Sequence, residues 1–203
     1  AVAYLVNPAN RNVNKVTIPE GRRLTEIFAL LSKGTGIPVA DYEKAAKNPD
    51  SLGLPPDAKG NLEGYLFPAT YDFGPKDTAE EQLRAMVGKM LDTTASLDVD
   101  SGQMHRILTI ASLVEAEGRR PEDLPKISRV IYNRLNTKLK LQFDSTVVYV
   151  VGRRGISTTP AERAINSPYN TYVVPGLPAG PISAPGEAAI KAALEPTPGS
   201  WIF

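Results

Sequence analysis

The sequence of 203 residues contains no cysteine and a single histidine, His105. The absence of cysteine excludes disulfide bonds, thiol catalysis and cysteine-ligated metals, and leaves the redox compartment open. One histidine also excludes a zinc site built from several imidazoles. Lysine and arginine number 23 against 22 acidic residues, so the net charge of +1 gives no electrostatic attraction to a polyanion. We therefore expect no metal, no cofactor and no nucleic-acid partner.

Long apolar runs are also missing. No stretch approaches the ~18 apolar residues that cross a bilayer, and no signal peptide opens the chain. The start at Ala1 without a methionine and the end at Phe203 suggest a portion of a longer protein, with any membrane anchor outside the sequence. Hydrophobic residues at 42% and charged residues at 22% are typical of a globular chain that buries a real core.

The first part of the chain predicts a small unit of two strands and two helices. After an apolar run at 1–6, a brief strand at 16–18 is closed by Pro19-Glu20-Gly21, helices follow at 24–31 and 39–47, and residues 70–73 supply a returning strand. This order resembles a LysM-like module, a βααβ fold that often binds N-acetylated glycans. An ordinary structural subdomain is an equally good interpretation.

Residues 62–73, LEGYLFPATYDF, combine aromatic side chains with one carboxylate, Glu63. Such a cluster suits a saccharide, because sugar C–H groups stack on ring faces while carboxylates accept hydroxyl hydrogen bonds. The alternative places Tyr65, Phe67 and Tyr71 in the core between subdomains, and for the aromatics we favour that interpretation. For Glu63 both interpretations stay open.

The second part predicts helices at 77–97, from 100 or 101 to 117, at 124–135 and at 187–194, with a short strand at 200–203. The periodic signal fades at 139–151, where four hydrogen-bonding side chains, Gln142, Asp144, Ser145 and Thr146, fall within five positions. An irregular Pro- and Gly-rich reach follows at 152–185. Segments of that length and composition inside a compact protein are typical of functional loops.

Two acids, Glu115 and Glu117, stand at the end of the most apolar predicted helix, which Gly118 and Pro121 stop. At about 100° per residue they point to nearly opposite sides, each beside apolar neighbours. A carboxyl against apolar side chains has a raised pKa and can act as a general acid near neutral pH. Both acids could equally lie at a solvated helix end, and periodicity does not choose between them.

Six blocks in the same order carry a resemblance to a known family: LEGYLFPATYDF, IASLVEAEG, SRVIYNRL, LQFDSTVVYVVG, SPYNTYVVPGLPAGPISAPG and WIF. Together they resemble the YceG-like (MltG) family of endolytic murein transglycosylases, from about Val16 to the end. The resemblance implies an α+β fold. It places a LysM-like subdomain with its leading segment and linker in 1–75. In 76–203 it places a mostly helical, loop-rich catalytic domain with a few short strands, which in other members continues further.

The resemblance implies a bacterial enzyme that cuts nascent peptidoglycan strands between N-acetylmuramic acid and N-acetylglucosamine. The muramyl C6 hydroxyl attacks its own anomeric carbon and leaves a 1,6-anhydro end. The first acid of SLVEAEG, Glu115, is the implied general acid and then base, which one residue can supply. The implied substrate-binding residues are Glu63, Gln142, Asp144, Ser145, Thr146, Asn170 and Tyr172.

An N-terminal membrane helix outside the sequence is implied as well, with this portion on the extracytoplasmic side and cell-wall synthesis enzymes such as penicillin-binding proteins as partners. Two other readings stay open. A hydrolytic muramidase would need a second carboxylate, such as Asp144 or Glu63, roughly 5 to 9.5 Å from Glu115. A non-catalytic wall-binding or scaffold protein would bind glycan without cleaving it.

We expect Glu117 to be an exposed acid. The family often has LPPG where this chain has LPAG at 177–180.

Overall fold

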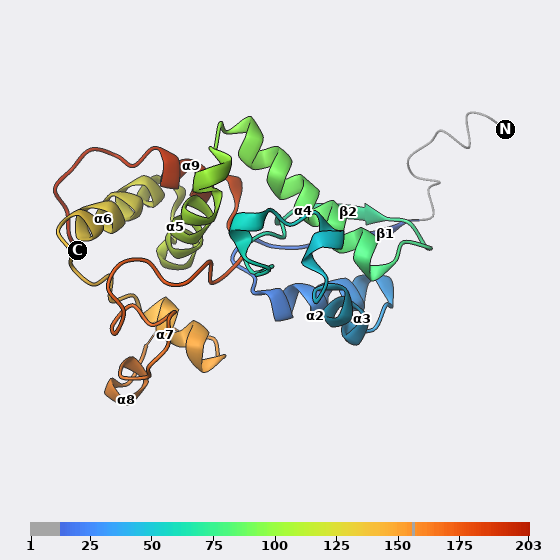
Figure 1. Ribbon diagram of the computed structural model, residues 1–203, viewed down its shortest axis with the longest axis horizontal. Coiled ribbons are helices and arrows are strands. Elements are labelled where there is room, and N and C mark those ends of the chain that lie inside the picture. Colours follow the sequence, from blue (N-terminus) through green and yellow to red (C-terminus); the bar gives the residue numbers. More distant parts are fainter. Residues whose placement is uncertain (1–12, 156) are drawn as a thin grey trace.

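The computed structural model describes residues 13–155 and 157–203, so the apolar run expected as a strand at 1–6 lies outside the described residues. The described part is mostly helical with one two-stranded antiparallel sheet, which confirms the α+β expectation in its broad form (Figure 1). Within it, no helix is long and apolar enough to span a bilayer. The elements are β1 Asn14–Thr17, α2 Leu24–Thr35, α3 Val39–Ala45, β2 Thr70–Phe73, α4 Ala79–Ser96, α5 Met104–Glu117, α6 Leu124–Asn136, α7 Asp144–Val151, α8 Pro160–Arg163 and α9 Glu187–Leu194.

The strands β1 and β2 pair antiparallel with Val16 opposite Tyr71, and α2 and α3 lie in the chain between them. Both side chains of that pair are buried, because alternate strand residues face the helices. Helix α2 ends where Gly36 adopts a left-handed conformation with φ of 79°, as the glycine pattern predicted. The strand β2 has the predicted bounds.

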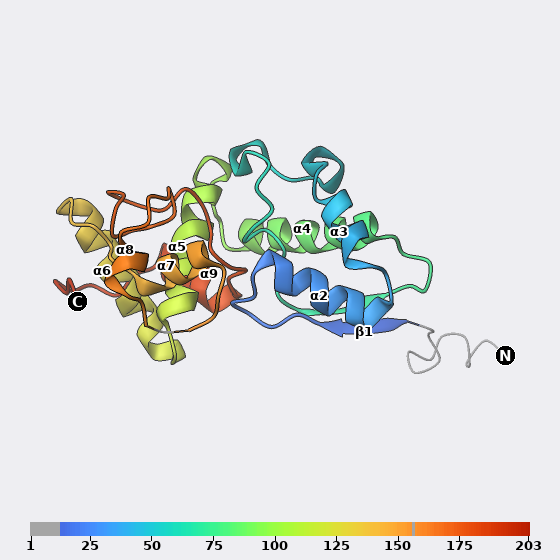
Figure 2. The same cartoon turned by 90° about the horizontal axis from the view of Figure 1, so that it is seen from below.

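Helix α4 belongs spatially with this first group of elements (Figure 2). It packs against α3 and a short 3-10 helix, Pro49–Leu52. The buried Tyr42 hydroxyl of α3 donates a hydrogen bond of 2.6 Å to Gln82 Oε1 of α4. Three aromatics of the 62–73 stretch were interpreted as core side chains, and their burial confirms that interpretation: Tyr65, Phe67 and Tyr71.

The other end of the molecule is built on α5, which packs against α9, α6 and α7 (Figures 1 and 2). Every residue from Ile107 to Val114 is buried, including the polar Thr109 and Ser112. Their hydroxyls donate to carbonyls of the preceding turn, which satisfies them within the helix. On α9 the buried Ala189, Ala192 and Ala193 let the two helices approach closely. The central helix is therefore a rigid base that positions its last turn.

Two expectations about local structure are wrong. Helix α7 forms where the periodic signal fades, since burial of Val147 and Val148 outweighs the weak helix propensity of β-branched residues. Residues 200–203 form no strand. The carbonyls of Trp201 and Ile202 instead accept hydrogen bonds of 2.8 Å from the side chains of Asn133 and Arg134 on α6. Side-chain donors from a helix thus hold the segment in place of a neighbouring strand.

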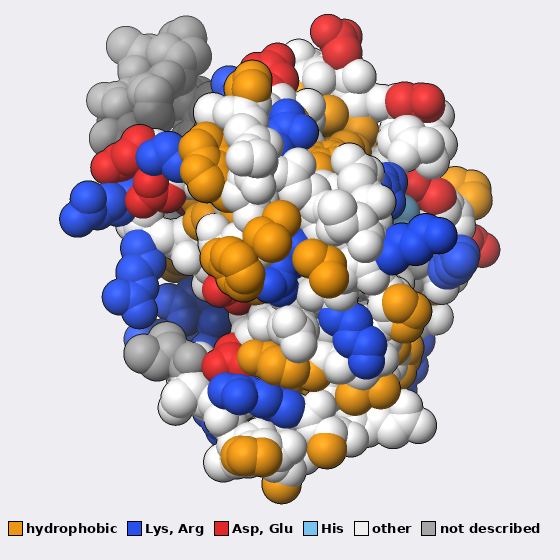
Figure 3. All heavy atoms as spheres, turned by 90° about the vertical axis from the view of Figure 1, so that its left-hand side faces the viewer, with side chains coloured by type: hydrophobic (Ala, Val, Ile, Leu, Met, Phe, Trp, Pro, Cys, Tyr) orange, Lys and Arg blue, Asp and Glu red, His pale blue; other side chains and the backbone are white. Residues whose placement is uncertain are grey.

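Figure 3 looks onto the end of the molecule that lies at the left of Figure 1, where α6, α7 and α8 are found. Hydrophobic side chains on this face lie scattered between lysines, arginines and a few acids. Isolated apolar side chains of this kind are normal on protein surfaces. Among the residues that the structure describes, this face therefore shows no large apolar patch of the kind that marks a binding surface.

Candidate active site

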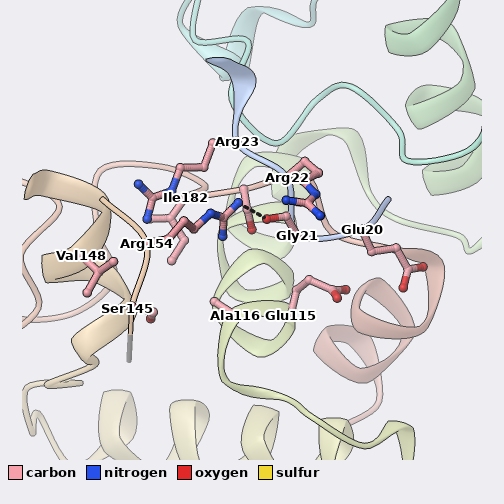
Figure 4. A pocket seen from close by; sticks show the side chains of 12 residues that line it. Glu20, Gly21, Arg22, Arg23, Glu115, Ala116, Ser145, Val148, Arg154 and Ile182 are labelled. Atoms are coloured by element: carbon pink, nitrogen blue, oxygen red, sulfur yellow. Dashed lines mark hydrogen bonds between the residues drawn. The ribbon is translucent and has the colours of Figure 1, made fainter. Parts of the chain in front are cut away.

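A cavity of about 420 Å³ lies at the junction between the two groups of elements (Figure 4). Its walls come from the turn after β1, the last turn of α5, helix α7 with its following loop, and the loop before α9. Two backbone hydrogen bonds of 2.8 Å join the walls, from Gly21 to the Ala184 carbonyl and from Ala184 to the Arg22 carbonyl. The lining residues are Glu20, Gly21, Arg22, Arg23, Glu115, Ala116, Ser145, Val148, Arg154, Gly155, Ile182 and Ser183.

Glu115 reaches this cavity from the last turn of α5, where its side chain is half-buried. Its Oε2 accepts a hydrogen bond of 3.1 Å from the backbone N–H of Gly186, the residue that precedes α9. Burial raises the pKa of Glu115, the Gly186 hydrogen bond opposes that rise, and the charge of Glu20 adds to it. A carboxyl in this environment keeps its proton at higher pH than a solvated glutamate does.

The turn Pro19-Glu20-Gly21 forms the wall next to Glu115. Gly21 has φ of 69°, and a Cβ at this position would lie 3.7 Å from Cγ of Glu115, so the backbone of the turn lies against that side chain. The Glu20 side chain packs directly on Gly186, where it leaves no room for a Cβ. From the sequence, this turn was expected only to close a strand, whereas in the structure it also brings a second carboxylate, that of Glu20, to the cavity.

Three arginines that the sequence pattern did not single out line the cavity: Arg22, Arg23 and Arg154. In Figure 4 the guanidinium groups of Arg23 and Arg154 lie along one side, and the carboxylates of Glu20 and Glu115 lie across from them. Arg154 pairs with Glu26 and donates 3.1 Å to the Gly21 carbonyl. Arg22 lies 3.6 Å from the same Glu26. The cavity is therefore polarised, with a basic side and an acidic side. The signal in the sequence was slight: a basic pair, Arg153-Arg154, after the glycine that ends α7.

Two serine hydroxyls complete the lining. Ser183 Oγ and Ser145 Oγ are buried, and neither makes a hydrogen bond of acceptable geometry with a described residue. Buried hydroxyls without a partner are rare, because each forfeits the hydrogen bonds it made to water. Both residues line the Glu115 cavity, whereas the other two buried polar atoms without a partner among the described residues, Asp57 Oδ1 and Ser128 Oγ, lie outside it.

Glu117 is half-buried, so the expectation of an exposed acid is wrong. Its side chain points away from Glu115, toward the start of α7, as the helical geometry requires. Burial raises the pKa of Glu117, the nearby hydroxyl and amide of Ser145 lower it, and Asp144 raises it. Glu117 is absent from the residues that line the cavity, so the two acids separate into one that faces the cavity and one that faces α7.

Glu63 lies behind the cavity wall and is only 5% exposed. Its two carboxylate oxygens accept from the backbone N–H of Leu24 at 3.0 and 3.3 Å, and Oε2 accepts from the Tyr149 hydroxyl at 3.4 Å. Burial raises the pKa of Glu63 to about 7 against these hydrogen bonds. Glu63 therefore joins the first turn of α2 to α7, and thereby fixes the spacing of two cavity walls.

Four more of the predicted substrate-binding residues form a hydrogen-bonded network around α7 and the loop 163–172, which we call the α7 network: Asp144, Thr146, Asn170 and Tyr172. Asp144 accepts from the hydroxyls of Tyr172 and Thr158, each at 2.7 Å, which with Arg163 lowers the pKa of Asp144 despite its partial burial. Thr146 shares a hydrogen bond of 2.9 Å with Thr171. Asn170 donates to the carbonyls of Arg163 and Ile165.

Gln142 lies elsewhere. Its backbone has φ of 55°, its N–H donates 3.1 Å to the Thr171 carbonyl, and its exposed side chain lines a separate hollow beside Lys140 and Phe203. Of the seven predicted substrate-binding residues, all described, Ser145 alone lines the Glu115 cavity. Within the described residues, no three His, Cys, Asp or Glu side chains gather closely enough to hold a metal ion.

A profile of the YceG-like family matches residues 1–203. The chain belongs to this family. The curated relatives include an endolytic murein transglycosylase of Bacillus subtilis strain 168, which is 36% identical over 221 residues that cover all of this chain and 61% of that protein. An endolytic murein transglycosylase of Streptococcus pneumoniae serotype 2 is 38% identical over 155 residues, covering 72% of this chain and 28% of that protein.

The fold is shared with a solved structure. A crystal structure of a putative YceG-like protein from Listeria monocytogenes matches with a TM-score of 0.80 and 32% identity, over 93% of this chain and 69% of that one. The chain therefore spans 61% of the length of its Bacillus relative and about two thirds of the Listeria structure. The Bacillus and Streptococcus relatives are both named endolytic murein transglycosylase.

Proposed function

We propose that this protein is an endolytic murein transglycosylase that cleaves the β-1,4 bond between N-acetylmuramic acid and N-acetylglucosamine in nascent strands. The observation that carries the proposal is the cavity that Glu115 lines, where its carboxyl is half-buried and has a raised pKa because of that burial. Its relatives in the YceG-like family carry the name of this activity.

In this proposal, protonated Glu115 donates its proton to the glycosidic oxygen as the bond from that oxygen to the muramyl C1 breaks. The resulting carboxylate then accepts the proton of the muramyl C6 hydroxyl as O6 bonds to C1, which leaves the 1,6-anhydro ring. Glu115 returns to its starting state, so no water and no second nucleophile are consumed. The Gly186 N–H stabilises the carboxylate formed midway.

Glu20 has two effects in this scheme. Its negative charge keeps the proton on Glu115 before the reaction, and the same charge stabilises the oxocarbenium-like transition state that develops at C1. Because Glu20 follows β1, the first group of elements becomes part of the active site. Ser145 is the predicted substrate-binding residue that lines this cavity. Glu63 and the α7 network stay predicted contributors, with contacts that also hold the walls in place.

A hydrolytic muramidase is the second candidate, and one observation favours it. A hydrolase needs a second carboxylate beside the acid, and Glu20 lines the same cavity as Glu115. Asp144 and Glu63, the candidates from sequence, are each engaged by several protein donors. In such a hydrolase, Glu20 would activate the water molecule in place of Asp144 or Glu63.

We further propose that the unit from β1 to β2 is LysM-like and contributes to glycan binding. The order β1, α2, α3, β2 and the antiparallel pairing of its strands support this proposal. The division into residues 1–75 and 76–203 is kept as a proposal, as are a single-pass membrane anchor, an extracytoplasmic location and penicillin-binding protein partners, all of which rest on the family resemblance.

Product analysis in ¹⁸O-labelled water tests the proposed activity. Uncross-linked peptidoglycan strands are incubated with the protein, and the new muramyl ends are examined by mass spectrometry. Intramolecular attack predicts anhydro-muramyl ends that carry no ¹⁸O and lack one water relative to reducing ends. Reducing ends that carry one ¹⁸O would establish the hydrolase instead, and strands left intact under saturating binding would contradict both enzymes.

A further inference from the structure

The three arginines of the cavity differ in what their guanidinium groups contact. Arg22 and Arg154 both lie against Glu26, so the charge of that acid serves two arginines. The guanidinium of Arg23 makes no ion pair or hydrogen bond with any residue that the structure describes. It lies 5.3 Å from the centre of the Tyr149 ring. Stacking on a ring leaves the N–H groups in the guanidinium plane free to bind another group.

Arg23 is also half-buried, so its charge is partly removed from water. The nearest acids that act on it, Glu26 and Glu63, are engaged elsewhere: Glu26 by Arg154, and Glu63 by the Leu24 N–H. A desolvated guanidinium without a partner is costly, and an incoming anion offsets that cost. Among anions, a carboxylate fits the planar fork of donors in a bidentate manner.

The position of Arg23 relative to Glu115 narrows the choice of anion. Both side chains line one cavity, and in the proposed reaction Glu115 acts at C1 of the muramyl residue. In murein glycan the muramyl residue bears an acidic substituent, the lactyl ether at C3 of the same ring. Its carboxyl is either free or joined to a peptide that carries carboxylates of its own. The Ser183 hydroxyl, which has no partner among the described residues and lines the same cavity, offers a neutral hydrogen bond to this substituent.

We propose that Arg23 binds a carboxylate of the lactyl or lactyl-peptide substituent of the muramyl residue, and so makes the cavity selective for muramyl-containing strands. The inference rests on the proposed function, because it takes murein glycan as the substrate. It adds a specificity-determining residue to that function, on the side of the cavity opposite the reacting carboxyl.

Binding measurements on three ligands of equal length test this inference, all in the Glu115→Gln background so that nothing is cleaved. The ligands are peptide-bearing uncross-linked strands, amidase-treated strands that keep a free lactyl carboxylate, and N-acetylglucosamine oligomers that have no carboxylate. We expect Arg23→Gln to weaken binding of carboxylate-bearing strands about tenfold, in line with a charge-assisted hydrogen bond, and to leave the neutral oligomers unchanged.

The two carboxylate-bearing ligands distinguish the source of the anion. Weakening for peptide-bearing strands alone assigns Arg23 to a peptide carboxylate, whereas weakening for amidase-treated strands assigns it to the lactyl carboxylate. Arg23→Lys keeps the charge but loses the fork, so we expect it to restore part of the affinity. Arg84→Gln, which removes an exposed arginine on α4, is the matched control for net charge.

Equal affinity of the Arg23→Gln protein and its parent for all three ligands would overturn the inference. Equal weakening for all three, the neutral oligomers included, would also overturn it, because a structural role has that signature. Thermal unfolding of each variant checks that α2 and Tyr149 stay packed. Since binding is measured without turnover, failure of the proposed cleavage reaction would show in the products of the parent protein and not in these affinities.

Discussion

The Glu115 cavity and the α7 network are both rich in polar side chains, but their hydrogen bonds differ. In the α7 network, Asp144, Thr146 and Asn170 find their partners within the protein. In the cavity, the hydroxyls of Ser145 and Ser183 are buried without partners. The Arg23 guanidinium likewise has no counterion among the described residues. A satisfied network fixes the fold, whereas an unsatisfied one keeps binding capacity for a ligand.

The comparison gives the two regions different signatures under mutation. Removing a satisfied polar group leaves its partners buried and unpaired, so stability falls. Removing a group that has no protein partner leaves no other group unpaired, so the free energy of unfolding stays unchanged while ligand affinity falls. The predictions below separate these signatures, beginning with a residue that touches both regions.

Glu63 joins α2, which begins at the cavity, to Tyr149 of α7, and it carries the largest expected effect on stability. Its pKa of about 7 in the folded protein lies above the 4.5 of an ordinary glutamate because of burial. The folded state therefore binds the proton more tightly, and stability declines as pH rises from 4.5 through 7. The Glu63→Gln protein lacks this decline because glutamine does not titrate, while its amide oxygen can still accept from the Leu24 N–H.

Relative to the parent, Glu63→Gln should gain on the order of 3 kcal/mol of unfolding free energy between pH 4.5 and pH 8. Denaturant unfolding at both pH values measures the difference. A constant difference across that range would show that Glu63 titrates as a solvated acid and would remove it from the buried link between the two regions.

Thr146→Val tests the satisfied network. Valine keeps the volume but leaves the Thr171 hydroxyl and amide without the oxygen that they contact at 2.9 and 3.3 Å. We expect a loss of about 2 kcal/mol in unfolding free energy and an unchanged turnover number for the folded protein. A stable variant with reduced turnover would instead place Thr146 in direct contact with the substrate.

Ser183→Ala is the matched change in the cavity. The hydroxyl has no partner among the described residues, so its removal should leave stability unchanged or slightly higher. We expect kcat/KM on murein strands to fall by about tenfold, the equivalent of one lost hydrogen bond to the substrate. A lower melting temperature with an unchanged kcat/KM would show that Ser183 stabilises the fold and does not bind the substrate.

The smallest expected effect is a shift of the pH profile in Glu20→Gln, which accompanies the lower rate expected from loss of a charge that stabilises the transition state. The general acid acts while protonated, so activity falls as pH rises through the pKa of Glu115. Burial is the main reason that this pKa is raised, and the charge of Glu20 adds to it. Loss of that charge moves the alkaline limb of the profile to lower pH, while the other charged groups of the cavity, Arg22, Arg23 and Arg154, are unchanged.

The Glu43→Gln protein, which loses an exposed acid on α3, provides the control for net charge. Its profile should coincide with that of the parent. An alkaline limb that stays in place in Glu20→Gln would show that Glu20 does not act on Glu115 electrostatically.

Local patterns predicted much of the fold. The bounds of β2, the stripe of α2 and the apolar helix that ends at Glu117 follow from alternation, helical spacing and glycine stops. Helix α7 was missed because its β-branched run favours no helix by itself and forms one only when packed. The strand expected at 200–203 failed because its carbonyls are bound by α6 side chains.

The site was less accessible to sequence reasoning. The choice of Glu115 over Glu117 came from the family resemblance, since helical periodicity treats the two acids alike. Arg23 and Glu20 escaped notice because the cavity exists only where the turn at 19–21 is hydrogen-bonded to Ala184, far along the chain. The periodicity of apolar residues along the sequence does not indicate such a long-range contact. The sequence analysis selected residues such as Asp144 and Asn170 because polar side chains cluster around them. Such clusters occur both in structural hydrogen-bond networks and in binding sites, so composition does not distinguish the two.

The most direct test of the proposed mechanism compares Glu115→Gln with Glu117→Gln, two identical changes at positions two residues apart on the last turn of α5. The rate of anhydro-muramyl end formation from uncross-linked strands is measured by mass spectrometry, with thermal unfolding as the check on folding. Glu115→Gln should reduce this rate about 10²- to 10⁴-fold, as expected for loss of the general acid and base, while Glu117→Gln stays within about tenfold of the parent. A folded Glu115→Gln protein that still forms these ends, or an equal loss in Glu117→Gln, would contradict the assignment of the chemistry to the Glu115 cavity.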